Sequence, residues 1–143
     1  MKSVKIIFLV VSIAVFSSIC TGDENNDKTL NVKGRCVIFF GLPQNEFDSY
    51  SEEDQDEINE AISDFYYYCN EALPFLKEKG INYYFTAMDN IQIKLQNNKT
   101  ITYERKNNKH IVGVILTDGK NPKVHLSIET DYLNIFKDYF KIK

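Results

Sequence analysis

Cys36 and Cys69 are the residues whose side chains could do covalent chemistry in a folded domain. In an oxidising compartment such a pair can form a disulfide, or act as a thiol–disulfide pair, where the Cα atoms lie within about 7 Å. The alternative is two buried free thiols that pack as small apolar side chains. No Cys-x-x-Cys motif occurs and the two histidines lie far apart, so the spacing predicts no metal site and no cofactor.

The position of Cys69 argues against catalysis. A reactive thiolate needs a pKa lowered by a helix N-terminus or by a nearby cation. Cys69 falls in the second half of a predicted helix, on its apolar face, where burial raises the pKa instead. His110 and His125 have no serine or cysteine at the spacing of a nucleophile elbow. No catalytic residue is therefore predicted.

Tyr66, Tyr67 and Tyr68 form the candidate interaction surface. Consecutive residues of a helix are about 100° apart around its axis, so three in a row cannot all face one core. At least one of these rings is therefore expected to be exposed, and exposed tyrosine is enriched at protein interfaces. The alternative is partial burial of all three under loops.

The first twenty residues are typical of a secretory signal. Lys2 and Lys5 precede the apolar run Ile6–Phe16, and the small residues Ser17 and Ser18 follow it. A helix that spans a bilayer needs roughly 20 apolar residues, so this run is too short to be one. The pattern predicts an exported protein whose working part begins after residue 20.

The end of this leader resembles a bacterial lipobox. Residues Ser17–Cys20 read Ser-Ser-Ile-Cys, although Ser17 and Ile19 stand where the pattern usually has Leu and Gly or Ala. The resemblance implies a lipid on Cys20 and a lipoprotein anchored to a membrane of the cell envelope. The alternative is ordinary cleavage near Ser18 or after Cys20, which gives a soluble secreted or periplasmic protein.

Composition limits the organisation and the partners. Residues 21–33 are polar and predict a flexible tether, and residues 34–143 have the length of one globular domain. Without Lys2 and Lys5 of the leader, 15 basic residues remain against 20 acidic ones, a net charge of about −5. This charge argues against nucleic acid and against attachment to anionic lipid through basic residues. In a eukaryotic secreted protein, Asn98-Lys99-Thr100 would be a glycosylation acceptor.

The hydrophobic pattern predicts alternating helices and strands. The unbroken apolar run Cys36–Phe40 is typical of a strand buried on both faces. A long helix follows, with Ser51 as its N-cap and Gly80 at its end. After it we expect a strand over 81–87, a hairpin over 91–106, strands over 111–116 and 123–128, and a last helix capped by Thr130. This order predicts the α/β (α+β) class, with a single mixed β-sheet flanked by helices.

This order of elements resembles the thioredoxin-like fold, which opens with strand–helix–strand and closes with strand–turn–strand–helix. Arg35–Phe40 is similar to the opening strand and Ile111–Phe140 to the closing unit, and Cys69 stands five residues before Pro74 as a cysteine does in that family's main helix. Tyr66–Cys69 holds only the second cysteine of a Cys-x-x-Cys. The resemblance therefore implies the fold without its redox chemistry, with the hairpin in place of a middle helix.

The sequence favours a non-enzymatic envelope lipoprotein whose domain binds an unknown protein or small ligand. The absence of a catalytic set and the tyrosine cluster support this interpretation. Two alternatives stay open at this point. One is a thiol–disulfide protein working through Cys36 and Cys69, and the other is a small inhibitor or immunity-type protein acting on a secreted enzyme.

Overall fold

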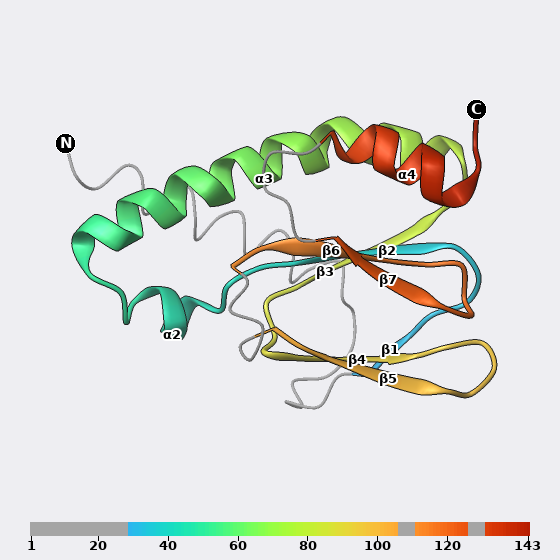
Figure 1. Ribbon diagram of the computed structural model, residues 1–143, viewed down its shortest axis with the longest axis horizontal. Coiled ribbons are helices and arrows are strands. Elements are labelled where there is room, and N and C mark those ends of the chain that lie inside the picture. Colours follow the sequence, from blue (N-terminus) through green and yellow to red (C-terminus); the bar gives the residue numbers. More distant parts are fainter. Residues whose placement is uncertain (1–28, 106–110, 126–130) are drawn as a thin grey trace.

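The computed structural model describes residues 29–105, 111–125 and 131–143, and their elements form three layers (Figure 1). Two helices cover one face of a four-stranded sheet, and a three-stranded sheet covers its other face. The helices are α2 (Gln44–Phe47), α3 (Glu52–Glu78) and α4 (Tyr132–Phe140), with α3 and α4 in the outer layer. The strands are β1 (Thr29–Asn31), β2 (Cys36–Phe40), β3 (Asn82–Thr86), β4 (Asn90–Lys94), β5 (Thr100–Glu104), β6 (Gly113–Thr117) and β7 (Pro122–His125).

The four-stranded sheet contains both units that the sequence predicts. Its strand order is β3-β2-β6-β7. β2 and β3 are parallel and are joined through α3, which is the expected strand–helix–strand unit. β6 pairs antiparallel with β2 and with β7, and α4 follows β7 in the chain. The predicted α/β class is confirmed.

The expectation of a single sheet is wrong, because the strands divide into two sheets. β1, β4 and β5 form a separate sheet in the order β1-β4-β5. The β4–β5 hairpin alternates between apolar and polar residues, so it has one face to bury. Ile91 and Ile93 of that face pack against Ile38 and Phe40 of β2. As a layer over β2, the hairpin buries this apolar face between the two sheets.

Part of the expected tether belongs to the fold. Thr29–Asn31 forms β1 and pairs parallel with Gln92–Lys94 of β4. The side chain of Val32 is 2% exposed and lies in the core between the sheets. Residues 21–28 of the expected tether lie outside the described residues.

β2 lies at the centre of the protein and explains the apolar run that encodes it. Val37 and Phe39 face the helices, whereas Cys36, Ile38 and Phe40 face the three-stranded sheet. Every residue of β2 is buried, because each face of the strand is covered by another layer. The protein therefore has two apolar cores, one on each side of β2.

The predicted long helix is confirmed as α3. The hydroxyl oxygen of Ser51 accepts a hydrogen bond from the backbone N–H of Asp54 at 3.2 Å, which caps the first turn. Its buried residues recur at helical spacing and face the sheet: Ile58, Ile62, Phe65, Cys69, Ala72 and Leu76. None of the helices in the described residues combines the length and the apolar character that a membrane crossing requires.

The final helix begins one residue later than the sequence suggests. Asp131 rather than Thr130 caps α4, because the Asp131 carboxylate accepts a hydrogen bond from the backbone N–H of Asn134 at 3.2 Å. Thr130 itself lies outside the described residues. Tyr132, Phe136 and Phe140 then face the sheet beside α3.

Candidate functional site

The structure places the two candidate cysteines on opposite faces of the four-stranded sheet. Cys36 belongs to the core between the two sheets, and Cys69 belongs to the core beneath the helices. Both are free thiols, with exposed fractions of 0% and 1%. Because β2 directs the Cys36 side chain away from α3, the two sulfur atoms cannot meet. This geometry agrees with the alternative interpretation, in which Cys36 and Cys69 are two buried free thiols rather than a disulfide.

Burial also works against thiol chemistry at either position. Desolvation raises the pKa of the Cys36 thiol to about 12, and it raises the pKa of Cys69 above its usual value as well. The reactive form of cysteine is the thiolate, which a raised pKa makes scarce. Both side chains therefore serve as small apolar parts of the two cores.

The three tyrosines of the cluster differ in exposure, as helical geometry predicts. Tyr67 is 61% exposed, whereas Tyr66 and Tyr68 are half-buried and pack against the core beneath the helices. Desolvation raises the pKa of Tyr66 to about 12. The prediction that at least one of the three rings is exposed is confirmed, and the exposed ring is that of Tyr67.

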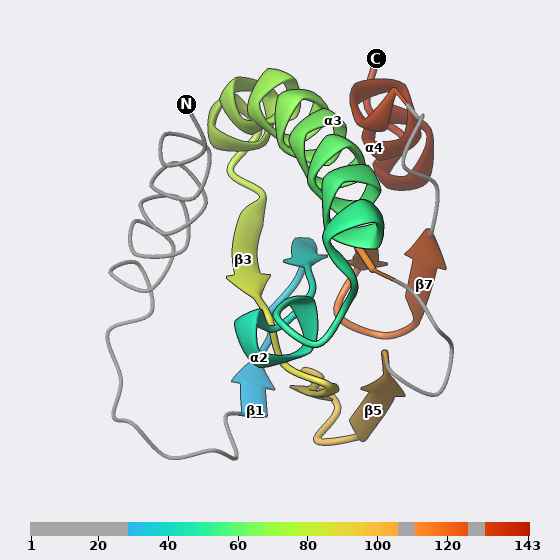
Figure 2. The same ribbon diagram turned by 90° about the vertical axis from the view of Figure 1, so that its left-hand side faces the viewer.

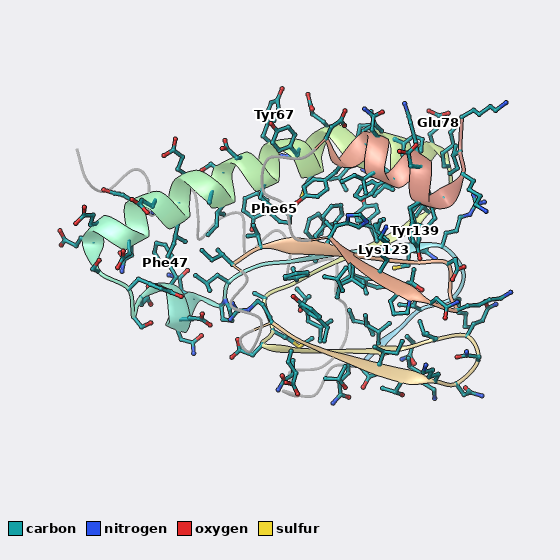
Figure 3. The ribbon with its side chains drawn as sticks, in the orientation of Figure 1. Phe47, Phe65, Tyr67, Glu78, Lys123 and Tyr139 are labelled. Atoms are coloured by element: carbon teal, nitrogen blue, oxygen red, sulfur yellow. The ribbon has the colours of Figure 1, made fainter. Side chains whose placement is uncertain are left out.

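Tyr67 points away from both sheets on the outer side of α3, while Phe65 points toward the sheet (Figure 3). A hydrogen bond with the Glu71 carboxylate, one turn further along the helix, is the main cause that raises the pKa of Tyr67. The ring itself remains accessible. A tyrosine of this kind offers an apolar surface with a polar end, which suits a protein interface.

Arg105 is the centre of a polar cluster that the sequence analysis missed. Its side chain is 1% exposed, and its Nη2 donates to a carboxylate oxygen of Glu46 and, at 2.5 Å, to Oδ1 of Asp89. The backbone N–H of Arg105 also donates to the carbonyl oxygen of Asp89 at 2.8 Å. On the other side of Glu46, the Tyr50 hydroxyl donates to its second oxygen at 3.4 Å. We call Arg105, Glu46 and Asp89 the Arg105 cluster.

The Arg105 cluster lies where the parallel strands β2 and β3 end. Glu46 is in α2, shortly after β2, and Asp89 follows β3. Arg105 comes directly after β5 of the other sheet. The cluster thus ties the two loops at the carboxyl ends of the parallel strands to the three-stranded sheet, at the edge where open α/β sheets commonly bind ligands.

The cluster holds one cation between two carboxylates. Burial acts to lower the pKa of the Arg105 guanidinium, but the hydrogen bonds and charges of Glu46 and Asp89 outweigh it, so the pKa is raised. Arg105 is therefore a fixed cation held by two carboxylates. Such an arrangement stabilises the loops and keeps the guanidinium charged.

The alternation of residues along β5 could have predicted that the Arg105 side chain is buried. Ile101 and Tyr103 of β5 point inward, and Arg105 follows at the same spacing of two residues. An arginine in phase with buried residues must find a carboxylate partner. The sequence does not say which acids those are, because Glu46 and Asp89 lie 59 and 16 residues away.

The remaining candidates do not assemble into a site. Among the residues that the structure describes, no group of three or more His, Cys, Asp or Glu side chains is placed to hold a metal ion. His125 is half-buried at the end of β7, where desolvation, followed by the charge of Lys123, lowers its pKa. Cys20 and His110 lie outside the described residues.

Comparison of the chain with models of protein families, with curated proteins and with solved structures finds no match.

Proposed function

We propose that this chain is an exported protein of the cell envelope, held at a membrane by a lipid on Cys20, whose domain binds another protein. The basic and apolar leader followed by a cysteine supports the export and the anchor. The buried thiols with raised pKa values favour a binding role over a thiol–disulfide role.

The exposure of Tyr67 is the observation that carries the binding role. Its ring stands on the side of α3 that faces away from both sheets, where it meets the ring of Tyr68 edge to face and stays mostly exposed (Figure 3). Most exposed residues around it on α3 are polar, and a large ring among polar neighbours is typical of an interface anchor. Because one residue cannot define a ligand, the contact surface extends over the face of α3 around Tyr67.

The same connectivity supports a thioredoxin-like frame for the domain. β2, α3 and β3 form a parallel strand–helix–strand unit, and β6, β7 and α4 follow as strand–turn–strand–helix. The β4–β5 hairpin stands where the family has its middle helix. We propose that this frame works here without redox chemistry, as a scaffold that holds α3.

The anchor is tested by replacing Cys20 with serine and fractionating the cells. We expect the wild-type chain in the membrane fraction, and the Cys20→Ser variant in the soluble envelope or retained as uncleaved precursor, because the lipid is attached through the Cys20 sulfur. Metabolic labelling with a fatty acid should mark the wild type only. A mature Cys20→Ser chain that still sediments with membranes would contradict the anchor.

The binding surface is tested by placing a photo-crosslinking amino acid at position 67 and, as a control, at Lys99. Lys99 is an exposed residue in the turn between β4 and β5, on the three-stranded sheet rather than on α3. We expect irradiation of whole cells to give a discrete adduct from position 67 and none from position 99. No adduct at 67, or equal adducts at both positions, would contradict the proposed surface. A secreted enzyme as the adduct would identify the chain as an inhibitor or immunity-type protein.

A further inference from the structure

The outer side of α3 carries charge of one sign only. Successive helix residues are about 100° apart around the axis, so residues at three and four positions from Tyr67 share its side. No lysine or arginine occurs between Glu52 and Leu76. Exposed acidic residues lie within about 60° of Tyr67 around the axis: Glu53, Asp56, Glu60, Asp64 and Glu71. We call Tyr67 and these carboxylates the acidic face.

The needs of the helix do not account for the middle of the acidic face. The helix dipole favours an acid in the first turn, such as Glu53, but this effect falls off within one turn. Asp56, Glu60 and Asp64 follow one another at a spacing of four residues, where like charges repel and destabilise a helix. Among the described residues, no cation forms an ion pair with any of these three. The helix therefore keeps a row of negative charge that works against its own stability.

Pro74 adds an uncharged acceptor to the same surface. Proline has no backbone N–H, so the carbonyl oxygen of Asn70 loses the donor that another residue at position 74 would supply. Asn70 and Pro74 are both exposed and lie on the side of α3 that carries Tyr67. The Tyr67 ring is thus flanked by Asp64 one turn before it, and by Glu71 and this carbonyl after it.

An aromatic ring among carboxylates suits a cationic partner. Lysine and arginine side chains interact with the face of a tyrosine ring and form charged hydrogen bonds with carboxylates beside it. From Glu53 to Glu71 the acidic face is about 27 Å long at 1.5 Å per residue, which is more than a single small cation needs and comparable with the width of a standard protein interface. Two copies of this chain would oppose like charges here, so the acidic face does not suit self-association.

On the basis of the contact surface proposed above, we propose that the acidic face binds a protein surface rich in lysine and arginine. The Tyr67 ring packs against a cation at the centre of the contact, and the carboxylates along α3 pair with the cations around it. Complementary charge of this kind steers the encounter and excludes acidic partners.

The place where the chain enters the fold leaves the acidic face accessible. Figure 2 shows β1 and β5 on the side of the molecule opposite α3, and β1 is the first described element. Residues 21–28, between a lipid on Cys20 and the start of β1 at Thr29, span at most about 30 Å. A lipid anchor therefore holds the three-stranded sheet nearer the membrane and turns the acidic face away from it. Repulsion between the acidic face and anionic lipid reinforces this direction.

The charge of the partner is tested with the photo-crosslinking amino acid at position 67 of the full chain. One variant adds Glu60→Gln and Asp64→Asn to this chain. The matched control adds Glu104→Gln and Asp138→Asn, at exposed positions on β5 and α4, and removes the same number of negative charges. We expect the adduct yield in whole cells to fall about fivefold in the first variant, as for the loss of two exposed ion pairs, and to stay unchanged in the control.

Three further measurements separate the charge of the acidic face from the stability of the fold. Neutralising Glu60 and Asp64 relieves repulsion along α3, so this variant should unfold at the same urea concentration as the wild type or at a higher one. In isolated envelopes, the adduct yield from position 67 should fall as salt is added, because ions screen exposed charges. The partner segment joined to position 67, identified by mass spectrometry, should be rich in lysine and arginine.

The outcomes distinguish the contact surface from the charge of its partner. No adduct from position 67 would contradict the contact surface itself. An adduct with equal yield in both charge variants, with a yield independent of salt, or with a neutral or acidic partner segment would leave the contact surface in place and overturn the cationic partner. A Glu60→Gln, Asp64→Asn chain that loses both stability and adduct would also overturn it, since these carboxylates would then serve the fold.

Discussion

Replacing Arg105 with methionine is expected to lower the free energy of unfolding by about 3 kcal/mol, the lower end of the range for breaking a buried ion pair. The substitution fills most of the space but leaves two carboxylates without their cation. Glu46 is 18% exposed and Asp89 43% exposed, so water can hydrate both in part, which places the effect at the lower end. Urea denaturation followed by circular dichroism measures the change.

The control variant for Arg105 is Asp89→Asn. Its carboxylate is more exposed than that of Glu46, and exposed pairs contribute little because solvent screens them, so its effect should be much smaller. Adding Glu46→Leu to Arg105→Met should recover part of the loss, since it removes the stranded charge that is more buried. If Arg105→Met unfolds at the same urea concentration as the wild type, the Arg105 cluster does not hold the loops together.

The sequence predicts local elements well because their signals are local. The five buried residues of β2 form an unbroken apolar run, and α3 has both its cap at Ser51 and one apolar face. Each of these features lies within a few residues of the others. The β4–β5 hairpin was visible for the same reason, since both strands alternate around a turn that contains Asn98 in the left-handed conformation, φ 63°.

The division into two sheets could not be predicted in the same way. Alternation shows that Ile91 and Ile93 share a buried face, but not whether that face extends the central sheet or covers it. The position of the hairpin depends on which apolar surfaces remain uncovered after β2 and α3 have packed together. Thr29–Asn31 illustrates the same limit, because it becomes a strand only by pairing with β4, 63 residues further along the chain.

The same distinction between local and long-range signals applies to the candidate functional residues. Periodicity predicts an exposed ring among Tyr66, Tyr67 and Tyr68, because it depends only on the helix that carries them. The Arg105 cluster and the separation of Cys36 from Cys69 depend on which layers meet, and these relations join residues far apart in the chain.

Phe39→Ala is expected to be the most damaging single substitution in the core, with a loss of about 3–5 kcal/mol. Phe39 is 1% exposed on the helix side of β2. Its ring stacks on Phe85 at 4.7 Å between centroids and meets Phe136 at 6.0 Å and Phe65 at 6.3 Å, edge to face. Truncation removes contacts with β3, α3 and α4 together and leaves a cavity that these three elements cannot close without moving apart.

Two control variants separate this effect from a general sensitivity of aromatic residues. Phe39→Leu keeps most of the volume and should cost less than about 1.5 kcal/mol. Tyr67→Ala removes an exposed ring and should change the free energy of unfolding by no more than about 0.5 kcal/mol. A typical domain is stable by only about 5–15 kcal/mol, so Phe39→Ala should lower the melting temperature by many degrees. A loss in Phe39→Ala no larger than in Phe39→Leu would show that the helices do not depend on this ring for their attachment to the sheet.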